Sequence, residues 1–181
     1  MPTLDDISLR RFGPEDAAAV REWFSNPDAT GDLMDESRAD FSEEDAKAWI
    51  ERAMDESGKD RKWAIMMAGE KDPVGFTALY GINSSTPPEL GCVLGADAAR
   101  GMGLGREAER LTIAKAFDEY DAHKVYGRIP ATNQGAKKAV ASLGWKHEGT
   151  LRSHIRRRGE LVDCEIWGVL PGEFRAATAD R

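Results

Sequence analysis

The chain has 181 residues, of which 41% are hydrophobic and 31% charged, which is enough for one well-buried core. Its 25 basic and 32 acidic side chains give a net charge of −7, which argues against non-specific nucleic-acid binding because that needs a basic surface. No apolar stretch approaches the ~20 residues of a membrane span and the first residues lack a signal-peptide pattern, so we expect a cytoplasmic protein with no membrane contact.

Cysteine and histidine are sparse. Cys92 and Cys164 are isolated, and none of the three histidines has metal-ligand spacing to a cysteine, so the sequence predicts neither a disulfide framework nor a metal site.

Charge is uneven along the chain. The first 60 residues hold 17 acidic and 7 basic side chains, whereas the remaining 121 hold 15 and 18. Opposite potentials on two sides of one domain would suit a cation and a phosphorylated ligand, although a solvated helical surface explains the acidic part equally well.

Apolar spacing and turn residues predict the elements of the first half of the chain. These are a strand at Ile7–Phe12, a helix at Pro14–Ser25, a loop at 28–41, a helix from the capping sequence at Ser42 to before Gly58, a hairpin of Trp63–Met67 and Val74–Ile82, and a strand at Glu89–Leu94.

The second half opens with a glycine-rich loop, Gly101–Gly105, which runs into a helix whose predicted face is Leu104, Ala108, Leu111, Ala114 and Phe117. The elements that follow are a strand at Lys124–Ile129, a helix at Gln134–Leu143, and two strand-like runs at Trp145–Ile155 and Leu161–Leu170. The pattern predicts one mixed α/β or α+β domain over 1–181, with its core at about 7–170 and a tail at 171–181 that frays from Arg175.

The loop from Arg100 to Arg106 is the clearest chemical motif. Glycines bring the backbone close to a ligand, and a helix N-terminus adds partial positive charge, so a pyrophosphate fits there. A nucleoside-triphosphate loop is excluded because Gly105 is followed by Arg106 and Glu107 instead of Lys and Ser or Thr. A dinucleotide fingerprint is met formally, but the acidic residue it needs after the next strand is replaced by Pro130.

The segment Arg100-Gly101-Met102-Gly103-Leu104-Gly105 resembles the pyrophosphate signature of the GNAT superfamily of acetyl-CoA-dependent N-acetyltransferases. The order of elements around it and the segment 143–149, Leu-Gly-Trp-Lys-His-Glu-Gly, are similar to the branch of ribosomal-protein N-terminal (RimJ/RimL-like) and spermidine acetyltransferases. The resemblance covers about residues 7–170.

This resemblance implies a mixed, mostly antiparallel sheet of about seven strands, flanked by helices, whose central strands splay apart into a slot for acetyl-CoA. Backbone groups of Cys92, Val93 and Leu94 would pair with the pantetheine arm and the acetyl carbonyl. The pyrophosphate would be held by Arg100, Gly101, Met102, Gly103, Leu104, Gly105 and Arg106. Asn133 would bond the arm from the other side, and Lys137 or Lys138 could approach a coenzyme phosphate. No metal is implied.

Family members commonly transfer the acetyl group by direct attack of an amine, which must first lose a proton. Glu89 is the predicted base because it stands at the mouth of the slot, although a solvent-facing carboxylate explains it equally well. The tyrosine that often protonates the leaving thiolate is replaced by Val140, which leaves Ser142 or water. We expect Tyr126 and His154 to be structural or surface groups and Cys92 to pack as a small apolar residue instead of acting as a nucleophile.

Only the distribution of charge narrows the choice among acceptor classes. The two N-terminal helices and the loop between them border the acceptor side in the family, and here they carry Glu22, Asp28, Asp32, Asp35, Glu36, Asp40, Glu43 and Glu44. Such a rim favours a cationic amine: a protein N-terminus, a polyamine, an aminosugar or a basic antibiotic. The basic tract of the last hairpin, at Arg152 and 156–158, would meet an anionic acceptor such as a nucleotide-sugar, or stay solvated.

Two further readings stay open. A domain that binds acyl-CoA without catalysis would also keep the slot, and the loss of the tyrosine at Val140 favours it. The aromatic residues Trp23, Phe24 and Trp49 fit either the core or the face of a homodimer.

Overall fold

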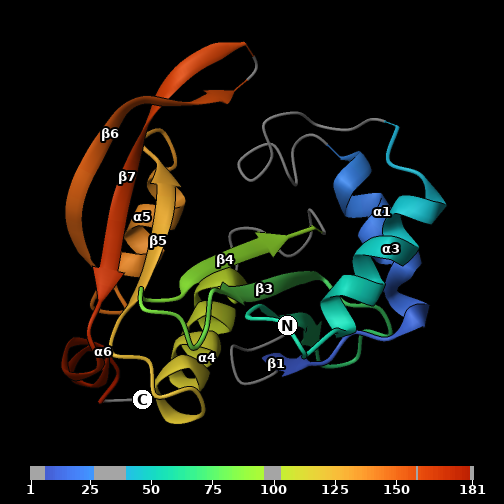
Figure 1. Cartoon of the computed structure of the whole chain (residues 1–181), viewed down its shortest axis with the longest axis horizontal. Coiled ribbons are helices and arrows are strands. Elements are labelled where there is room, and N and C mark those ends of the chain that lie inside the picture. Colours follow the sequence, from blue (N-terminus) through green and yellow to red (C-terminus); the bar gives the residue numbers. More distant parts are fainter. Residues whose placement is uncertain (1–6, 27–39, 96–102, 158, 180–181) are drawn as a thin grey trace.

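The computed structural model describes residues 7–26, 40–95, 103–157 and 159–179, which form a seven-stranded open sheet with five α-helices (Figure 1). The elements are β1 (Ile7–Arg10), a 3-10 helix (Pro14–Asp16), α1 (Ala17–Ser25), α3 (Glu43–Met54), β2 (Arg61–Met67), β3 (Gly75–Tyr80), β4 (Glu89–Leu94), α4 (Leu104–Asp118), β5 (Val125–Pro130), α5 (Gln134–Ala141), β6 (Lys146–Arg157), β7 (Glu160–Val169) and α6 (Pro171–Thr178). The strand order is β1-β2-β3-β4-β5-β7-β6. Every neighbouring pair is antiparallel except β4 and β5, which confirms the predicted mixed, mostly antiparallel sheet.

Helices cover both faces of the N-terminal half of this sheet. Alternation along β2 sends Ala64 to an aromatic cluster with α1 and α3, and it sends Ile65 to the opposite face, where α4 packs through Leu104 and Ala108. Trp23 and Phe24 are 2% and 4% exposed and belong to the first cluster, so they are core residues and not a dimer face.

Local sequence signals explain how the elements start. The side chain of Ser42 accepts the backbone N–H of Asp45 at 3.1 Å, and the Asp45 carboxylate accepts the backbone N–H of Ser42 at 3.0 Å, which is the predicted capping pattern of α3.

At the start of the chain Arg10 donates two hydrogen bonds of 2.7 Å to Asp16, whose side chain is 2% exposed. This ion pair fixes β1 against the 3-10 helix that precedes α1.

A buried hydroxyl pair ties α4 to the middle of the sheet. Thr112 Oγ1 lies 2.9 Å from Thr77 Oγ1, and Thr77 donates to the carbonyl of Gly91 at 3.1 Å. Both threonines are fully buried, so the pair satisfies polar groups where α4 crosses β3 and β4.

The C-terminal tail is the main correction to the predicted fold. The expected frayed segment forms α6, with Pro171 in its first turn and the backbone N–H of Leu170 donating to Glu173 at 3.0 Å. Phe174 is 7% exposed and packs edge-on against Phe117, with ring centroids 5.8 Å apart. Burial of one aromatic ring holds a helix that the polar and alanine-rich sequence around it did not suggest.

The other differences are shifts of element boundaries. β1 ends at Arg10 instead of Phe12, and β2 begins at Arg61 instead of Trp63. The predicted face of α4 is partly wrong, because Leu111 and Ala114 are only half-buried while Glu107, Glu109 and Thr112 are buried. In the part of the chain that the structure describes, no helix is long and apolar enough to cross a membrane.

Candidate active site

The sheet opens between its two central strands. β4 pairs with β3 along all six of its residues and β5 pairs with β7 along all six of its own, but β4 and β5 share one register pair, Glu89 with Tyr126. The backbone N–H of Tyr126 also donates to the carbonyl of Pro88 at 3.2 Å. Beyond this point no further β4–β5 pair exists among the described residues, and a cavity of about 790 Å³ lies there. We call this cavity the slot.

The lining of the slot comes from β4, β5, α4, α5 and an aromatic wall. The aromatic wall consists of Phe24, Trp49, Phe76 and Tyr80. Of the residues predicted from sequence, the slot brings together Glu89, Cys92, Val93, Leu94 and Asn133. The sequence left open whether Trp49 belongs to the core or to the face of a dimer. In the structure Trp49 lines the slot from inside the subunit.

The described part of the glycine loop starts α4. Gly103 is the N-cap, with φ of 80° in the left-handed region that favours glycine, and its carbonyl accepts the backbone N–H of Glu107 at 3.1 Å. A side chain at Gly105 would meet Leu94 of the slot at an ordinary 3.5 Å. Arg106 Nε is buried and has no hydrogen-bond partner within the described residues. The predicted contacts of Arg100, Gly101 and Met102 lie outside the described residues.

Glu89 lines the slot at its closed end, where β4 and β5 pair, and not at the mouth as predicted. Both of its carboxylate oxygens are engaged. Oε1 accepts from Arg128 Nε at 2.7 Å, and Oε2 accepts from the Tyr126 hydroxyl at a longer 3.3 Å. Burial and the nearby Glu89 raise the pKa of Tyr126, so the hydroxyl keeps its proton at neutral pH. Arg128, which sequence reasoning missed, is therefore the partner of the predicted base.

The Cys92 thiol points to helix α4. It donates to the carbonyl of Gly105 at 3.8 Å, and burial raises its pKa well above the usual range of a thiol. A thiol that stays protonated is a poor nucleophile, so this geometry agrees with the predicted packing role.

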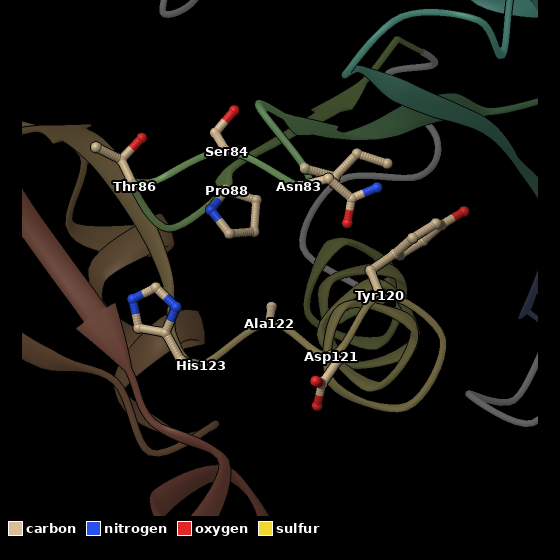
Figure 2. Close-up of a pocket in the computed structure, with 9 residues that line it drawn as sticks. Asn83, Ser84, Thr86, Pro88, Tyr120, Asp121, Ala122 and His123 are labelled. Carbon is tan, nitrogen blue, oxygen red and sulfur yellow. The ribbon is translucent and has the colours of Figure 1, made fainter.

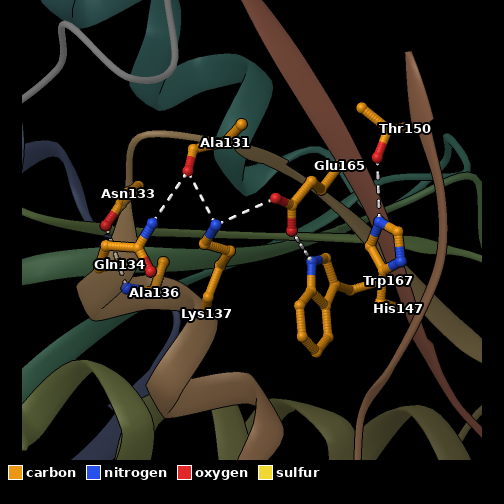
Figure 3. Close-up of polar contacts among 9 residues, drawn as sticks. All are labelled: Ala131, Asn133, Gln134, Ala136, Lys137, His147, Thr150, Glu165 and Trp167. Carbon is orange, nitrogen blue, oxygen red and sulfur yellow. Dashed lines mark hydrogen bonds and ion pairs between the residues drawn. The ribbon is translucent and has the colours of Figure 1, made fainter.

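Asn133 and Lys137 occupy the first turns of α5 (Figure 3). Asn133 caps the helix by accepting the backbone N–H of Ala136 at 3.0 Å, and it lines the slot. The Lys137 ammonium donates to the carbonyl of Ala131 at 2.8 Å and to Glu165 at 3.0 Å, and Glu165 also accepts from the Trp167 indole at 2.8 Å. Lys137 thus bridges α5 to β7 and does not line the slot.

Two slot residues of chemical interest were missed by sequence reasoning. Glu109 on α4 is 9% exposed, its Oε2 has no hydrogen-bond partner in the described part of the chain, and burial raises its pKa to about 8. The indole nitrogen of Trp145 is likewise buried without a partner among these residues. Val140 lines the slot as predicted from its position, but Ser142 is exposed and its hydroxyl donates to the carbonyl of Ala139 at 2.7 Å.

A second, smaller pocket of about 230 Å³ lies between the turn after β3 and the connection from α4 to β5 (Figure 2). Its lining includes Asn83, Ser84, Asp121 and His123 and none of the predicted site residues. No three His, Cys, Asp or Glu side chains of the described ranges come close enough to hold a metal ion.

Residues 6–146 match the family model described as the acetyltransferase (GNAT) domain. The chain belongs to the GNAT acetyltransferase family. Membership makes it an acyltransferase, and the family uses acetyl-CoA as donor.

Known relatives agree with this assignment. The chain is 24% identical over 171 residues, 93% of this chain and 94% of the relative, to the uncharacterized N-acetyltransferase p20 of Bacillus licheniformis. Its fold matches the spermidine N-acetyltransferase of Vibrio cholerae in complex with CoA and spermine, with a TM-score of 0.84, 18% identity and coverage of 94% of this chain and 98% of the other. It also matches the ribosomal-protein-S5-alanine acetyltransferase of Vibrio fischeri, with a TM-score of 0.81, 18% identity and coverage of 93% and 95%.

Proposed function

We propose that this protein transfers the acetyl group of acetyl-CoA to the primary amine of a cationic acceptor, either a protein N-terminus or a small amine. The observation that carries the proposal is the slot, whose lining extends from Leu94, which lies next to Gly105 at the start of α4, to the aromatic wall and Glu89. The donor enters along the glycine loop, and the acceptor enters from the aromatic wall. The two free thiols, Cys92 and Cys164, fit a reducing cytoplasm.

The coenzyme assignment follows from the chemistry of the slot's lining. The backbone edge of β4 at Cys92, Val93 and Leu94 has no β5 pairing within the described residues. Its C=O groups can therefore accept hydrogen bonds from the amides of the pantetheine arm, and its N–H groups can donate to them. The N-terminus of α4, from Gly103 through Leu104 and Gly105 to Arg106, suits the pyrophosphate because backbone N–H groups and the helix dipole favour an anion. The motif extends this site to Arg100, Gly101 and Met102.

Two residues of α5 complete the proposed coenzyme site. Asn133 lines the slot opposite β4, where its amide can bond the arm. The Lys137 ammonium has three donors, of which Ala131 and Glu165 take two, and the third can reach a coenzyme phosphate.

Glu89 is the proposed base. An ammonium acceptor must lose a proton before its nitrogen attacks the acetyl carbonyl, and the long 3.3 Å contact at Oε2 leaves that oxygen able to accept from the ammonium or from a bridging water. Attack forms a C–N bond and breaks the C–S bond, and the second proton lost by the nitrogen passes through water to the leaving thiolate, because Val140 offers no proton. The β4 backbone N–H groups at the slot stabilise the developing oxyanion.

The acceptor assignment rests on charge and on the aromatic wall. The acidic residues Glu22, Asp40, Glu43 and Glu44 lie on or beside α1 and α3, the helices that carry the wall residues Phe24 and Trp49. Carboxylates attract an ammonium group and aromatic rings bind it by cation–π contact. The complex of the spermidine N-acetyltransferase with spermine supports a cationic amine, and the ribosomal-protein-S5-alanine acetyltransferase supports a protein N-terminus.

The test is thiol release from acetyl-CoA with a panel of amines: N-terminal peptides, spermidine, aminoglycosides and amino-sugar nucleotides. We expect turnover with a peptide or a polyamine, a strong loss in Glu89→Gln, and loss of coenzyme binding in Gly103→Val. Gly69→Val is the matched control for backbone strain, because Gly69 has φ of 86° in a turn with nothing near its side-chain position. Glu148→Gln removes another ion-paired strand carboxylate, which bonds Lys124 at 2.6 Å.

Three outcomes decide among the readings. Turnover lost in Gly103→Val but kept in Gly69→Val supports the donor site. Binding of acetyl-CoA with no turnover of any amine overturns catalysis and leaves a binding module. Turnover only with amino-sugar nucleotides overturns the cationic acceptor and shifts attention to the basic tract of the β6–β7 hairpin.

A further inference from the structure

One carboxyl group inside the slot has no part in the proposed chemistry. Glu109 on α4 lines the same cavity as Cys92 and Asn133, and only 9% of its surface is exposed. Its Oε2 has no hydrogen-bond partner in the described part of the chain. Because buried polar groups are nearly always paired, an unpaired carboxyl oxygen on a side chain that lines a cavity points to a ligand that completes it.

The position of Glu109 on α4 places it midway along the slot. Ile113 and Ala116 pack in one cluster with Val140 and Leu143, and Glu109 continues this buried stripe one turn closer to the start of the helix, where the cavity replaces those neighbours. It stands six residues, ~9 Å along the helix axis, beyond Gly103. An ionised Glu109 would add to the effect of burial on the pKa of Cys92, which places the two side chains near each other beside β4.

Burial raises the pKa of Glu109 to about 8, which favours the protonated form of the carboxyl near neutral pH. The other titratable groups that line the slot are Tyr80, Glu89, Cys92 and Arg128. Within the described residues none of these groups forms an ion pair with Glu109, and Glu89 is paired with Arg128. A neutral carboxyl presents one O–H donor beside one C=O acceptor, and the two secondary amides of the pantetheine arm can complement them with the C=O of one amide and the N–H of the other.

We propose that Glu109 is a positioning residue for the donor: its carboxyl donates to the carbonyl of one amide of the pantetheine arm and accepts the N–H of the other amide. The proposal rests on the proposed function, because it needs the arm to lie in the slot. It assigns α4 a second role beyond the phosphate end, which is to hold the arm in register along β4. An ionised Glu109 would set its lone pairs against the amide carbonyl and bury a charge.

The experiment is calorimetric binding of desulfo-coenzyme A, which lacks the titratable thiol, at pH 7 and pH 9. Wild type is compared with Glu109→Gln, which donates and accepts at every pH, and with Glu109→Leu, which does neither. We expect the wild-type affinity to fall about tenfold from pH 7 to pH 9, following the pKa of about 8. Glu109→Gln should bind within about threefold of wild type at pH 7 with little pH dependence, and Glu109→Leu about tenfold more weakly at both.

The outcomes separate this proposal from the function on which it rests. If wild type binds but shares its pH profile with Glu109→Gln, the proposal is overturned and the coenzyme site stands. Binding by Glu109→Leu as tight as that of wild type overturns it too. If wild type does not bind desulfo-coenzyme A at either pH, the proposed function fails with it. Should Glu109→Leu not fold, the pH profiles of wild type and Glu109→Gln decide alone.

Discussion

The two halves of the sheet on either side of the slot are built differently. β1 to β4 form continuous antiparallel ladders with α1 and α3 on one face and α4 on the other, whereas β6 at the far edge of β5-β7-β6 is exposed along most of its length (Figure 1). Each half satisfies its own backbone pairing, and the halves meet at Glu89 and Tyr126. The slot therefore leaves only two inner strand edges to be completed, which a ligand arm can do.

The N-terminal half depends on the Arg10–Asp16 pair. In Asp16→Asn we expect a loss of about 3 kcal/mol in the free energy of unfolding, because Arg10 loses its charged partner while Asp16's site stays 2% exposed. Burial raises the pKa of Asp16, but hydrogen bonds from Arg10 and Gly13 outweigh it and lower the pKa overall. This stability is therefore present at neutral pH and lost as the pH falls below the usual carboxyl range.

Denaturant unfolding of Asp16→Asn measures this effect, with Glu15→Gln on the same turn as an exposed control. The variant and wild type should converge in acid. An equal loss at neutral and acid pH would show that the carboxylate's charge plays no part.

The buried carboxyl of Glu109 lowers the free energy of unfolding of the N-terminal half beside the slot. Its pKa of about 8 is raised above that of an unfolded chain, so its contribution is fully present below the unfolded value of ~4.3 and is lost as the pH rises toward 8. In Glu109→Gln we expect a gain of roughly 4 kcal/mol at pH 8 and about 1 kcal/mol at pH 5. Thermal unfolding at the two values measures it, with exposed Glu51→Gln as control. An unchanged gap between pH 5 and pH 8 would mean that the buried carboxyl is already ionised.

The junction of the halves can be overfilled at Gly127. A Cβ there would lie 3.2 Å from the Trp145 ring and 3.4 Å from the carbonyl of Leu90. In Gly127→Val we expect coenzyme affinity to fall by roughly 1–2 kcal/mol, about tenfold or more, because the side chain enters the slot. Gly149→Val in β6 is the control, since nothing lies within 4 Å of its side-chain position. Equal affinities in the two variants would place the coenzyme outside the slot.

The C-terminal half contains an ion pair of its own, between Lys137 on α5 and Glu165 on β7. In Lys137→Met we expect a stability loss of about 1 kcal/mol, because the Lys137–Glu165 pair is partly solvated at 17% and 16% exposure. Coenzyme affinity should also fall a few-fold if the third N–H reaches a phosphate. Lys124→Met breaks a comparable pair with Glu148, away from the slot, and should leave affinity unchanged. Affinity equal to wild type in Lys137→Met would remove this lysine from the coenzyme site.

The sequence predicted the slot strand β4 with its observed bounds, because turn residues before Glu89 and the apolar run to Leu94 carry a strong local signal. It also placed the start of α4, since a glycine run before an amphipathic helix has few other uses. Both features depend on neighbours in the chain. Their positions could therefore be predicted before any tertiary contact was known.

Features that depend on distant contacts escaped prediction. Glu109 sits among charged residues of α4 and resembles a solvated position until β4 and the cavity are placed beside it. Arg128 bonds Glu89 across the junction of β4 and β5. Phe174 stabilises α6 only because its ring packs against Phe117. The homodimer remains a prediction, because Trp23 and Phe24 pack inside the subunit.

A crystal structure with desulfo-coenzyme A bound tests the account most directly. The account predicts the pantetheine arm between β4 and β5, the pyrophosphate against residues 103–106, and a carboxyl oxygen of Glu109 within hydrogen-bond distance of an arm amide. A coenzyme bound elsewhere, with the space between the two strands filled by side chains, would contradict it.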